Sequence, residues 1–225
     1  TGRIPELVKR LRKSGAQVVW SGYLRNPGLF TPVRPCRVFG DELDRRLARL
    51  DARDPGMIFV PMSDLVPEGD PSLHQEDLVH PSPKGSAAIG ARIAAERGMS
   101  LIGTRYRFGG TSEAGFDCSG FIGYLFREEA GMNLPRSTRE MINVKAPLVA
   151  RNNLKPGDLL FFSTAGRGRV SHAGIYLGDN QFIHSSSRRS GGVRVDSLGD
   201  SYWSKTFIEA KRALAMAPTT VTASK

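Results

Sequence analysis

Cysteine is scarce in this sequence: only Cys36 and Cys118 occur among its 225 residues. Two cysteines do not build a disulfide framework, and pairing them would block Cys118, the candidate nucleophile described below. We therefore expect Cys118 to be a free thiol, and Cys36 to lie in the core or in a loop without a catalytic role.

Long apolar runs are also missing. None reaches the roughly 18 residues that span a bilayer, so we expect no transmembrane helix.

The first residues lack the basic and apolar regions of a signal peptide. Because the chain starts at Thr1 rather than at a methionine, we expect that an upstream export signal is missing from it.

Positive charge is abundant. The formal net charge of +10 comes largely from dispersed arginines, which favours attraction to anionic polymers of a cell envelope, to an anionic membrane or to nucleic acid. Zinc-finger spacing, RNP-like aromatic motifs and base-reading basic helices are missing, so specific nucleic-acid binding is not expected.

The sequence around Cys118 predicts a nucleophile in the first turn of a helix. Gly109 and Gly110 interrupt the backbone before it, and apolar residues at helical spacing follow from Phe121 onward. Backbone N–H groups and the positive end of the helix dipole stabilise a thiolate at such a position. The thiolate is the reactive form of cysteine, so we expect the helix start to activate Cys118.

Two strand-like segments further along the chain each carry a histidine, His172 and His184. A Gly-Asp-Asn sequence between them predicts a tight turn, so the two segments form a hairpin on which the imidazoles lie at comparable distances from the turn. Neighbouring positions are expected for them, although the sequence does not fix the register. One imidazole can act as a base and the other can orient it. A zinc site formed with Cys118 is the alternative, but the closely spaced ligand pairs of such sites are missing.

Taken in order, these motifs resemble those of the NlpC/P60 family of papain-like cysteine peptidases, over residues 93–212. The resemblance implies an α+β fold with helices packed on an antiparallel sheet, and cleavage of peptidoglycan stem peptides, typically between γ-D-glutamyl and a diamino acid. It implies catalytic roles for Cys118, His172 and His184, and no metal or cofactor. By the same resemblance, three residues line the substrate side of the cleft: Tyr106, Asp117 and Ser119.

Each of these three residues also has a purely structural interpretation. Asp117 can cap the helix, Ser119 can satisfy a backbone donor, and Tyr106 can be a core aromatic. Arg136 lies near the cleft or forms a surface salt bridge, and we expect His74 to be solvent exposed. Two alternatives to a peptidase stay open, namely an inactive or occluded wall-binding module and an acyltransferase or amidase on the same fold.

Residues 1–92 alternate helix-like and strand-like segments, which predicts βα units around a parallel sheet. The expected helices are 4–13, 41–50 and 86–97, the expected strands are 17–24 and 57–62, and the loop between the first strand and the second helix contains Pro27, Pro32 and Pro35.

Asp77 and His80 stand in an Asp-x-x-His-Pro sequence that resembles the last motif of SGNH (GDSL-type) hydrolases. Residues 1–92 are therefore expected to be a partial, flavodoxin-like α/β segment. The Gly-Asp-Ser nucleophile motif and the Gly-x-Asn-Asp motif of that family are missing, so we expect no esterase activity from it. Residues 213–225 are expected to form a flexible tail. Together the motifs predict a cell-envelope protein, periplasmic or secreted.

Overall fold

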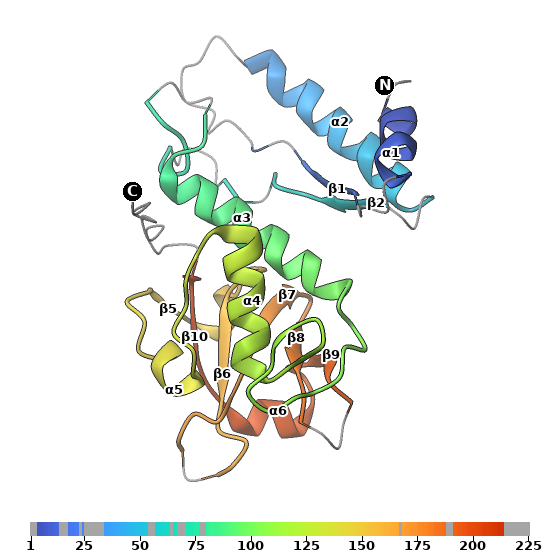
Figure 1. Cartoon of the computed structure of the whole chain (residues 1–225). Coiled ribbons are helices and arrows are strands. Elements are labelled where there is room, and N and C mark those ends of the chain that lie inside the picture. The colour runs from blue at the N-terminus through green and yellow to red at the C-terminus, as the bar shows by residue number, and fades with distance from the viewer. Residues whose placement is uncertain are drawn as a thin grey trace, which may run out of the picture. The chain divides into compact units, whose positions relative to one another are not determined.

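The structure is a computed structural model of the whole chain, which divides into two compact units, residues 1–85 and 86–225 (Figure 1). It describes residues 4–13, 18–22, 24, 34–53, 57–63, 65–66, 71–76, 80–166, 168–187 and 191–213. Almost all of the predicted tail lies outside these residues. The two units are considered in turn, each by itself.

A parallel pair of strands forms the centre of the first unit. Its elements are α1 (Ile4–Arg12), β1 (Val18–Ser21), α2 (Arg34–Asp51) and β2 (Met57–Val60). Val18 lies opposite Met57 in a parallel register, as the alternation of helix-like and strand-like segments predicts. Val8 of α1 and Leu47 of α2 are buried against the strands in a small apolar core, so each helix covers the sheet with its apolar side.

Two predictions for the first unit are wrong. The second helix begins at Arg34 rather than at residue 41, so Pro35 lies in its first turn and not in the loop. Proline is tolerated there because the first N–H groups of a helix have no intrahelical partner. His74 is buried rather than exposed. Its backbone N–H donates to the Pro71 carbonyl at 2.9 Å, and its backbone forms a β-bridge with Pro81. A local turn therefore encloses the residue.

The Asp77 and His80 pair receives no support from the structure. His80 is exposed, and Asp77 lies outside the described residues. The SGNH-like character of residues 1–92 therefore stays a prediction.

The second unit combines helices with an antiparallel sheet, as predicted. Six strands lie in the order β5-β10-β6-β7-β8-β9, and each hydrogen-bonded pair in this sheet is antiparallel. The helices that precede the sheet are α3 (Pro83–Met99), which begins at the end of the first unit, α4 (Cys118–Ala130) and α5 (Thr138–Met141), with the short hairpin β3 (Thr111–Ser112) and β4 (Gly115–Phe116) ahead of α4. The later elements are β5 (Leu148–Val149), η1 (Arg151–Asn153), β6 (Leu159–Phe162), β7 (His172–Gly178), β8 (Gln181–Ser185), β9 (Val193–Ser197), α6 (Ser201–Thr206) and β10 (Phe207–Lys211).

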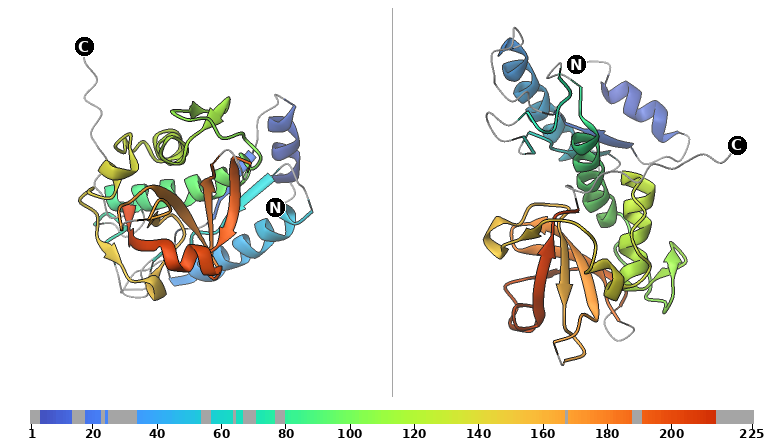
Figure 2. Two further views of the ribbon diagram at one scale, coloured as in Figure 1. Left: turned by 90° about the horizontal axis from the view of Figure 1, so that it is seen from below. Right: turned by 90° about the vertical axis from the view of Figure 1, so that its left-hand side faces the viewer.

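Side chains alternate between the two faces of this sheet, and a different helix covers each face. Ile183 of β8 points toward α3 and α4, since a Cβ placed on Gly98 of α3 would lie 3.3 Å from its Cδ1 and 3.2 Å from Cδ1 of Leu125. Phe182 points the opposite way and is buried with Trp203 of α6. Figure 2 shows α4 and α6 on opposite sides of the sheet. Among the described helices of the chain, none is long and apolar enough to cross a membrane.

Candidate active site

Cys118 is the first residue of α4, as the sequence predicts. The helix starts there because Asp117 adopts an extended backbone (φ −89°, ψ 176°) and its carboxylate accepts the N–H of Gly120 at 2.7 Å, which is the geometry of an N-cap. The helix is held in place by the burial of Phe121 and Leu125. Cys118 is a free thiol of intermediate exposure. The side chain of Cys36, within α2, lies outside those that the structure describes.

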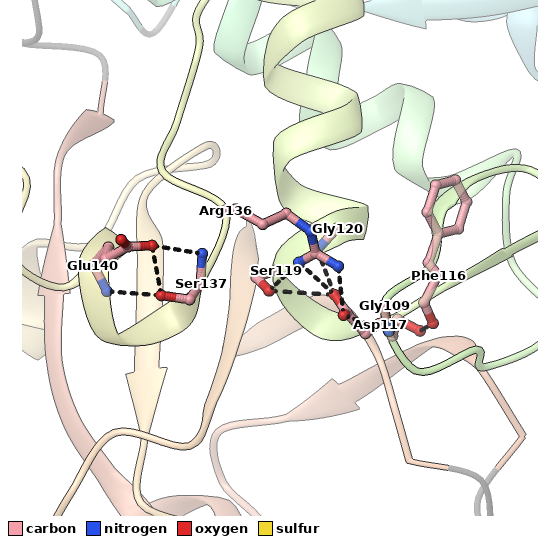
Figure 3. A network of polar contacts seen from close by, with 9 residues as sticks. Gly109, Phe116, Asp117, Ser119, Gly120, Arg136, Ser137 and Glu140 are labelled. Atoms are coloured by element: carbon pink, nitrogen blue, oxygen red, sulfur yellow. Dashed lines mark hydrogen bonds and ion pairs between the residues drawn. The ribbon is translucent and has the colours of Figure 1, made fainter.

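The Asp117 carboxylate also holds three segments around the start of α4 (Figure 3). Arg136 donates to both of its oxygens, at 3.1 and 2.7 Å, and Gly109 donates its backbone N–H at 3.0 Å. Ser119 donates its hydroxyl to Asp117 at 3.2 Å and accepts from Arg136 at 2.8 Å. Although burial raises the pKa of Asp117, the bond from Arg136 brings it below its usual value. Asp117 thus caps the helix and Arg136 forms a salt bridge, as both structural interpretations predict. Both side chains lie beside Cys118.

Cys118 lies beside the first residues of β7, the strand that carries His172. The backbone N–H of Ala173, the residue after His172, points toward its sulfur. The Ser185 hydroxyl of β8 donates to the carbonyl of Phe116 at 2.8 Å in a buried contact, which fixes the segment leading into α4 against the sheet. The nucleophile therefore lies at the end of the sheet where β7 begins.

The N–H groups at the helix start favour the thiolate of Cys118, as expected, but other groups outweigh them. Burial raises the pKa of the thiol, and the negative charge of Asp117 raises it further. The N–H groups of Ala173, Ser119 and Cys118 lower it, but they do not compensate for burial. A thiolate loses its hydration in an enclosed site, so the neutral thiol is the resting form.

Tyr106 completes the predicted substrate side. It is of intermediate exposure and forms a β-bridge with Phe116, two residues before the nucleophile. Burial raises the pKa of its phenol, and the negative forms of Cys118 and Asp117 raise it further, which places the ring near both. The structure thus brings Tyr106, Asp117 and Ser119 together around Cys118, although their roles in binding stay predictions.

The two histidines are neighbours, as the predicted hairpin requires. Asp179 (φ 48°) and Asn180 (φ 59°) have left-handed backbones, as in the two-residue turns that close hairpins. The register Ile175↔Ile183 places both imidazoles on one face of the sheet. His172 Nε2 lies 2.7 Å from His184 Nδ1, and the two rings meet edge to face with centroids 4.8 Å apart.

Asp196 of β9 extends this pair, and the sequence analysis missed it. Its Oδ2 lies 3.0 Å from His184 Nε2 and accepts the indole N–H of Trp203 at 3.0 Å. Its Oδ1 accepts the Arg194 side chain at 2.9 Å. Burial by itself raises the pKa of Asp196, but the bonds from His184 and Arg194 bring it below its usual value. An acidic residue in the β-rich sequence that follows His184 was the available signal.

The ionised Asp196 determines where the imidazole protons lie. A carboxylate only accepts, so His184 carries its proton on Nε2 and leaves Nδ1 to accept from His172 Nε2. Burial lowers the pKa of both histidines, that of His172 to about 3, so both are neutral near pH 7. His172 then keeps an unprotonated Nδ1, the atom needed in a general base.

The zinc alternative finds no geometric support here. Within the described part of the chain, no group of three or more His, Cys, Asp or Glu side chains is arranged to hold a metal ion. Both nitrogens of His184 are engaged, one with His172 and one with Asp196, so this imidazole has no lone pair left for a metal.

If the Cys118 thiol and the His172 imidazole are both neutral at rest, the reactivity of the thiol should depend on pH. Between pH 6 and 8, alkylation of Cys118 by iodoacetamide should accelerate by about tenfold per pH unit, because only the thiolate reacts and its fraction grows with pH below the raised pKa. The rate is measured by mass spectrometry of the intact chain, with Cys118→Ala separating labelling at Cys36. A rate that is already maximal near pH 5 would contradict the neutral pair and indicate a preformed thiolate and imidazolium.

Comparison with known proteins agrees with this geometry. The model of the NlpC/P60 family matches residues 103–212. "Murein DD-endopeptidase MepS/Murein LD-carboxypeptidase" of Escherichia coli K12 is 47% identical over 113 residues, which are 50% of this chain and 57% of the relative. "Probable endopeptidase NlpC" of the same strain is 38% identical over 138 residues, which are 59% of this chain and 88% of the relative.

A solved structure supports the same assignment. An NlpC/P60 family protein from Bacillus cereus is 31% identical with a TM-score of 0.51, over 55% of this chain and 40% of that one. The match to MepS spans little more than half of that relative's length, whereas the match to NlpC spans most of it. On the strength of that second match and of the family model, the chain belongs to the NlpC/P60 family.

Proposed function

We propose that this chain is a cysteine endopeptidase of the cell envelope that hydrolyses amide bonds in peptidoglycan stem peptides. One arrangement carries the proposal. Asp196, His184 and His172 are linked by consecutive hydrogen bonds, and the backbone N–H of Ala173, the residue after His172, points at the Cys118 sulfur. A thiol, a base and an orienting group in this order are the parts of a nucleophilic hydrolase.

In the proposed reaction, His172 Nδ1 takes the thiol proton while the Cys118 sulfur attacks the carbonyl carbon of the scissile amide. The C–N bond of the tetrahedral intermediate then breaks, and His172 returns the proton to the departing amine. A water molecule attacks the acyl-enzyme with His172 again as base, which releases a carboxylic acid and restores the thiol. His184 keeps the His172 imidazole in the productive tautomer, and Asp196 acts on His184 as a positioning residue.

The oxyanion of the intermediate needs donors at the start of α4. The N–H of Cys118, in the first turn of the helix, is the donor that we assign to it. One such donor is worth about 3 kcal/mol of transition-state stabilisation. By resemblance, Tyr106, Asp117 and Ser119 line the substrate side of the cleft, and we assign the acyl part of the substrate to them. Asp117 and Ser119 are held by Arg136, so their positions are set before substrate binds.

The names of the relatives guide the choice of substrate. Murein is the substrate in the name of the first relative, and a DD-endopeptidase acts between two D-configured centres. We keep the bond between γ-D-glutamyl and a diamino acid as our proposal, and the DD cross-link is the alternative that this name favours. A periplasmic or secreted location follows from such a substrate, and the net charge of +10 suits anionic envelope polymers.

The proposal is tested by digesting a set of defined muropeptides, linear and cross-linked, with the purified chain. We expect a new amine and a new carboxylic acid at one peptide bond, identified by mass spectrometry. The mass gained is that of one water, whereas an acyltransferase on this fold would attach an added amine instead. Intact peptides after prolonged incubation, together with retained binding, would replace the proposal by the wall-binding alternative.

A further inference from the structure

A cavity of about 340 Å³ lies beside the histidines, on the sheet face that α6 covers. His172, the base of the proposed reaction, forms part of the cavity wall. The other lining residues come from the β6–β7 connection, from β9 and its preceding loop, and from α6: Thr164, Ser186, Ser187, Arg194, Asp196, Tyr202 and Trp203.

The position of this cavity relates it to the leaving group. A second, smaller cavity of about 110 Å³ is lined by Ser119 and Arg136 near the start of α4, on the side to which the proposed function assigns the acyl part of the substrate. The larger cavity is lined instead by His172, the residue that gives a proton to the departing amine. The part of the substrate that is released as an amine must therefore lie next to the larger cavity.

The lining of the larger cavity suits an anion. Arg194 places a guanidinium there whose side chain is 44% exposed, and four lining residues, Thr164, Ser186, Ser187 and Tyr202, bring hydroxyl groups. Asp196 is the one acidic side chain among the lining residues. Its two oxygens accept from His184, Trp203 and Arg194, and its side chain is only 11% exposed, so the positive charge of Arg194 is the more accessible one. A planar guanidinium pairs well with a carboxylate.

We propose that this cavity binds a free carboxylate on the leaving-group side of the scissile bond, with Arg194 as its counterion. The ligand is an amino acid or peptide residue whose amine is released by the reaction and whose carboxyl group is not amidated. Tyr202, half exposed at the cavity, covers the apolar part of the same residue. This inference rests on the proposed function, because it assumes that His172 serves the departing amine.

The test uses two stem peptides that differ only in the leaving residue, whose carboxyl group is free in one and amidated in the other. We expect the wild-type chain to cleave the free acid with kcat/KM at least about tenfold higher, as one charge-assisted pair allows. In Arg194→Gln the preference should fall to about one, mainly through KM for the free acid. Any disturbance of Asp196 would slow the cleavage of both peptides equally. The ratio of their kcat/KM values therefore reports only the contact with the carboxylate.

Two controls keep the failure of this inference separate from that of the proposed function. Arg139→Gln removes the same charge from α5, outside both cavities, and should keep the wild-type preference. Binding of both peptides to Cys118→Ala, with and without Arg194→Gln, is measured by calorimetry, which needs no turnover. Equal cleavage or equal binding of the two peptides by chains that keep Arg194 would overturn the carboxylate site, whether or not either peptide is cleaved.

Discussion

Replacing Cys118 by alanine is expected to abolish muropeptide hydrolysis, with kcat/KM falling by at least about 10⁴-fold. The sulfur is the atom that bonds to the substrate carbonyl in the proposed reaction, and a methyl group has neither a lone pair nor a proton to give to His172. Hydrolysis is followed by mass spectrometry of the products over incubations long enough to detect a residual rate of this size.

Two measurements accompany this variant. Cys36→Ala is the matched control, because it removes the other thiol of the chain and should keep full activity. The melting temperature of Cys118→Ala should stay close to that of the wild type, since the thiol makes no ion pair or disulfide in the described structure. Turnover that survives in folded Cys118→Ala would rule out the nucleophile assignment.

Replacing Asp196 by asparagine is the second change with a large expected effect. Asparagine can donate its amide N–H to His184 Nε2, which reverses the tautomer: His184 Nδ1 then carries the proton and donates to His172 Nε2. The His172 proton moves to Nδ1, and the base is lost. We expect kcat to fall by about 10² to 10⁴-fold, the usual value of general base catalysis, with a smaller change in KM.

The pH profile distinguishes this tautomer effect from a simple loss of packing. With burial holding the pKa of His172 near 3, its neutral form predominates well above that pH, so wild-type kcat/KM should show no acid limb near pH 6.5. Asp196→Asn has no base and depends on spontaneous thiolate, so its kcat/KM should rise steadily with pH toward the raised pKa of Cys118. Trp203→Phe is the matched control, since it removes one donor to Asp196 and leaves the bond to His184. A flat profile in Asp196→Asn would refute the positioning role.

The elements of the site that depend on neighbouring residues were predictable from the sequence. The start of α4 follows from Asp117 and the apolar spacing after it, and the hairpin of β7 and β8 follows from the turn at Asp179 and Asn180. Both are local, because an N-cap bonds within one turn and a two-residue turn sets the register of its strands. The meeting of His172 and His184 needs one further feature, the register shift between Tyr176 and Gly178, which brings both imidazoles to the same face of the sheet.

What the sequence analysis missed depends on contacts between distant segments. Asp196 lies 12 residues beyond His184, and Trp203 reaches it from α6, an element without an expected position in the sequence. A salt bridge was expected for Arg136, but not its partner Asp117, which lies 19 residues away. No short motif specifies such pairs, since they form only when the strand order places β9 beside β8 and α6 over the sheet.

The sequence by itself thus predicted the family and the α+β architecture of the second unit, and it proposed the thiol and the two imidazoles as site residues, because helix starts, tight turns and strand alternation are encoded locally. Only the tertiary structure decided the protonation states. Burial raises the pKa of Cys118 and lowers that of His172, against the helix-dipole expectation, and the carboxylate of Asp196 assigns the tautomers. Desolvation is a property of everything packed around a group, and for that reason it becomes visible only once the chain has folded.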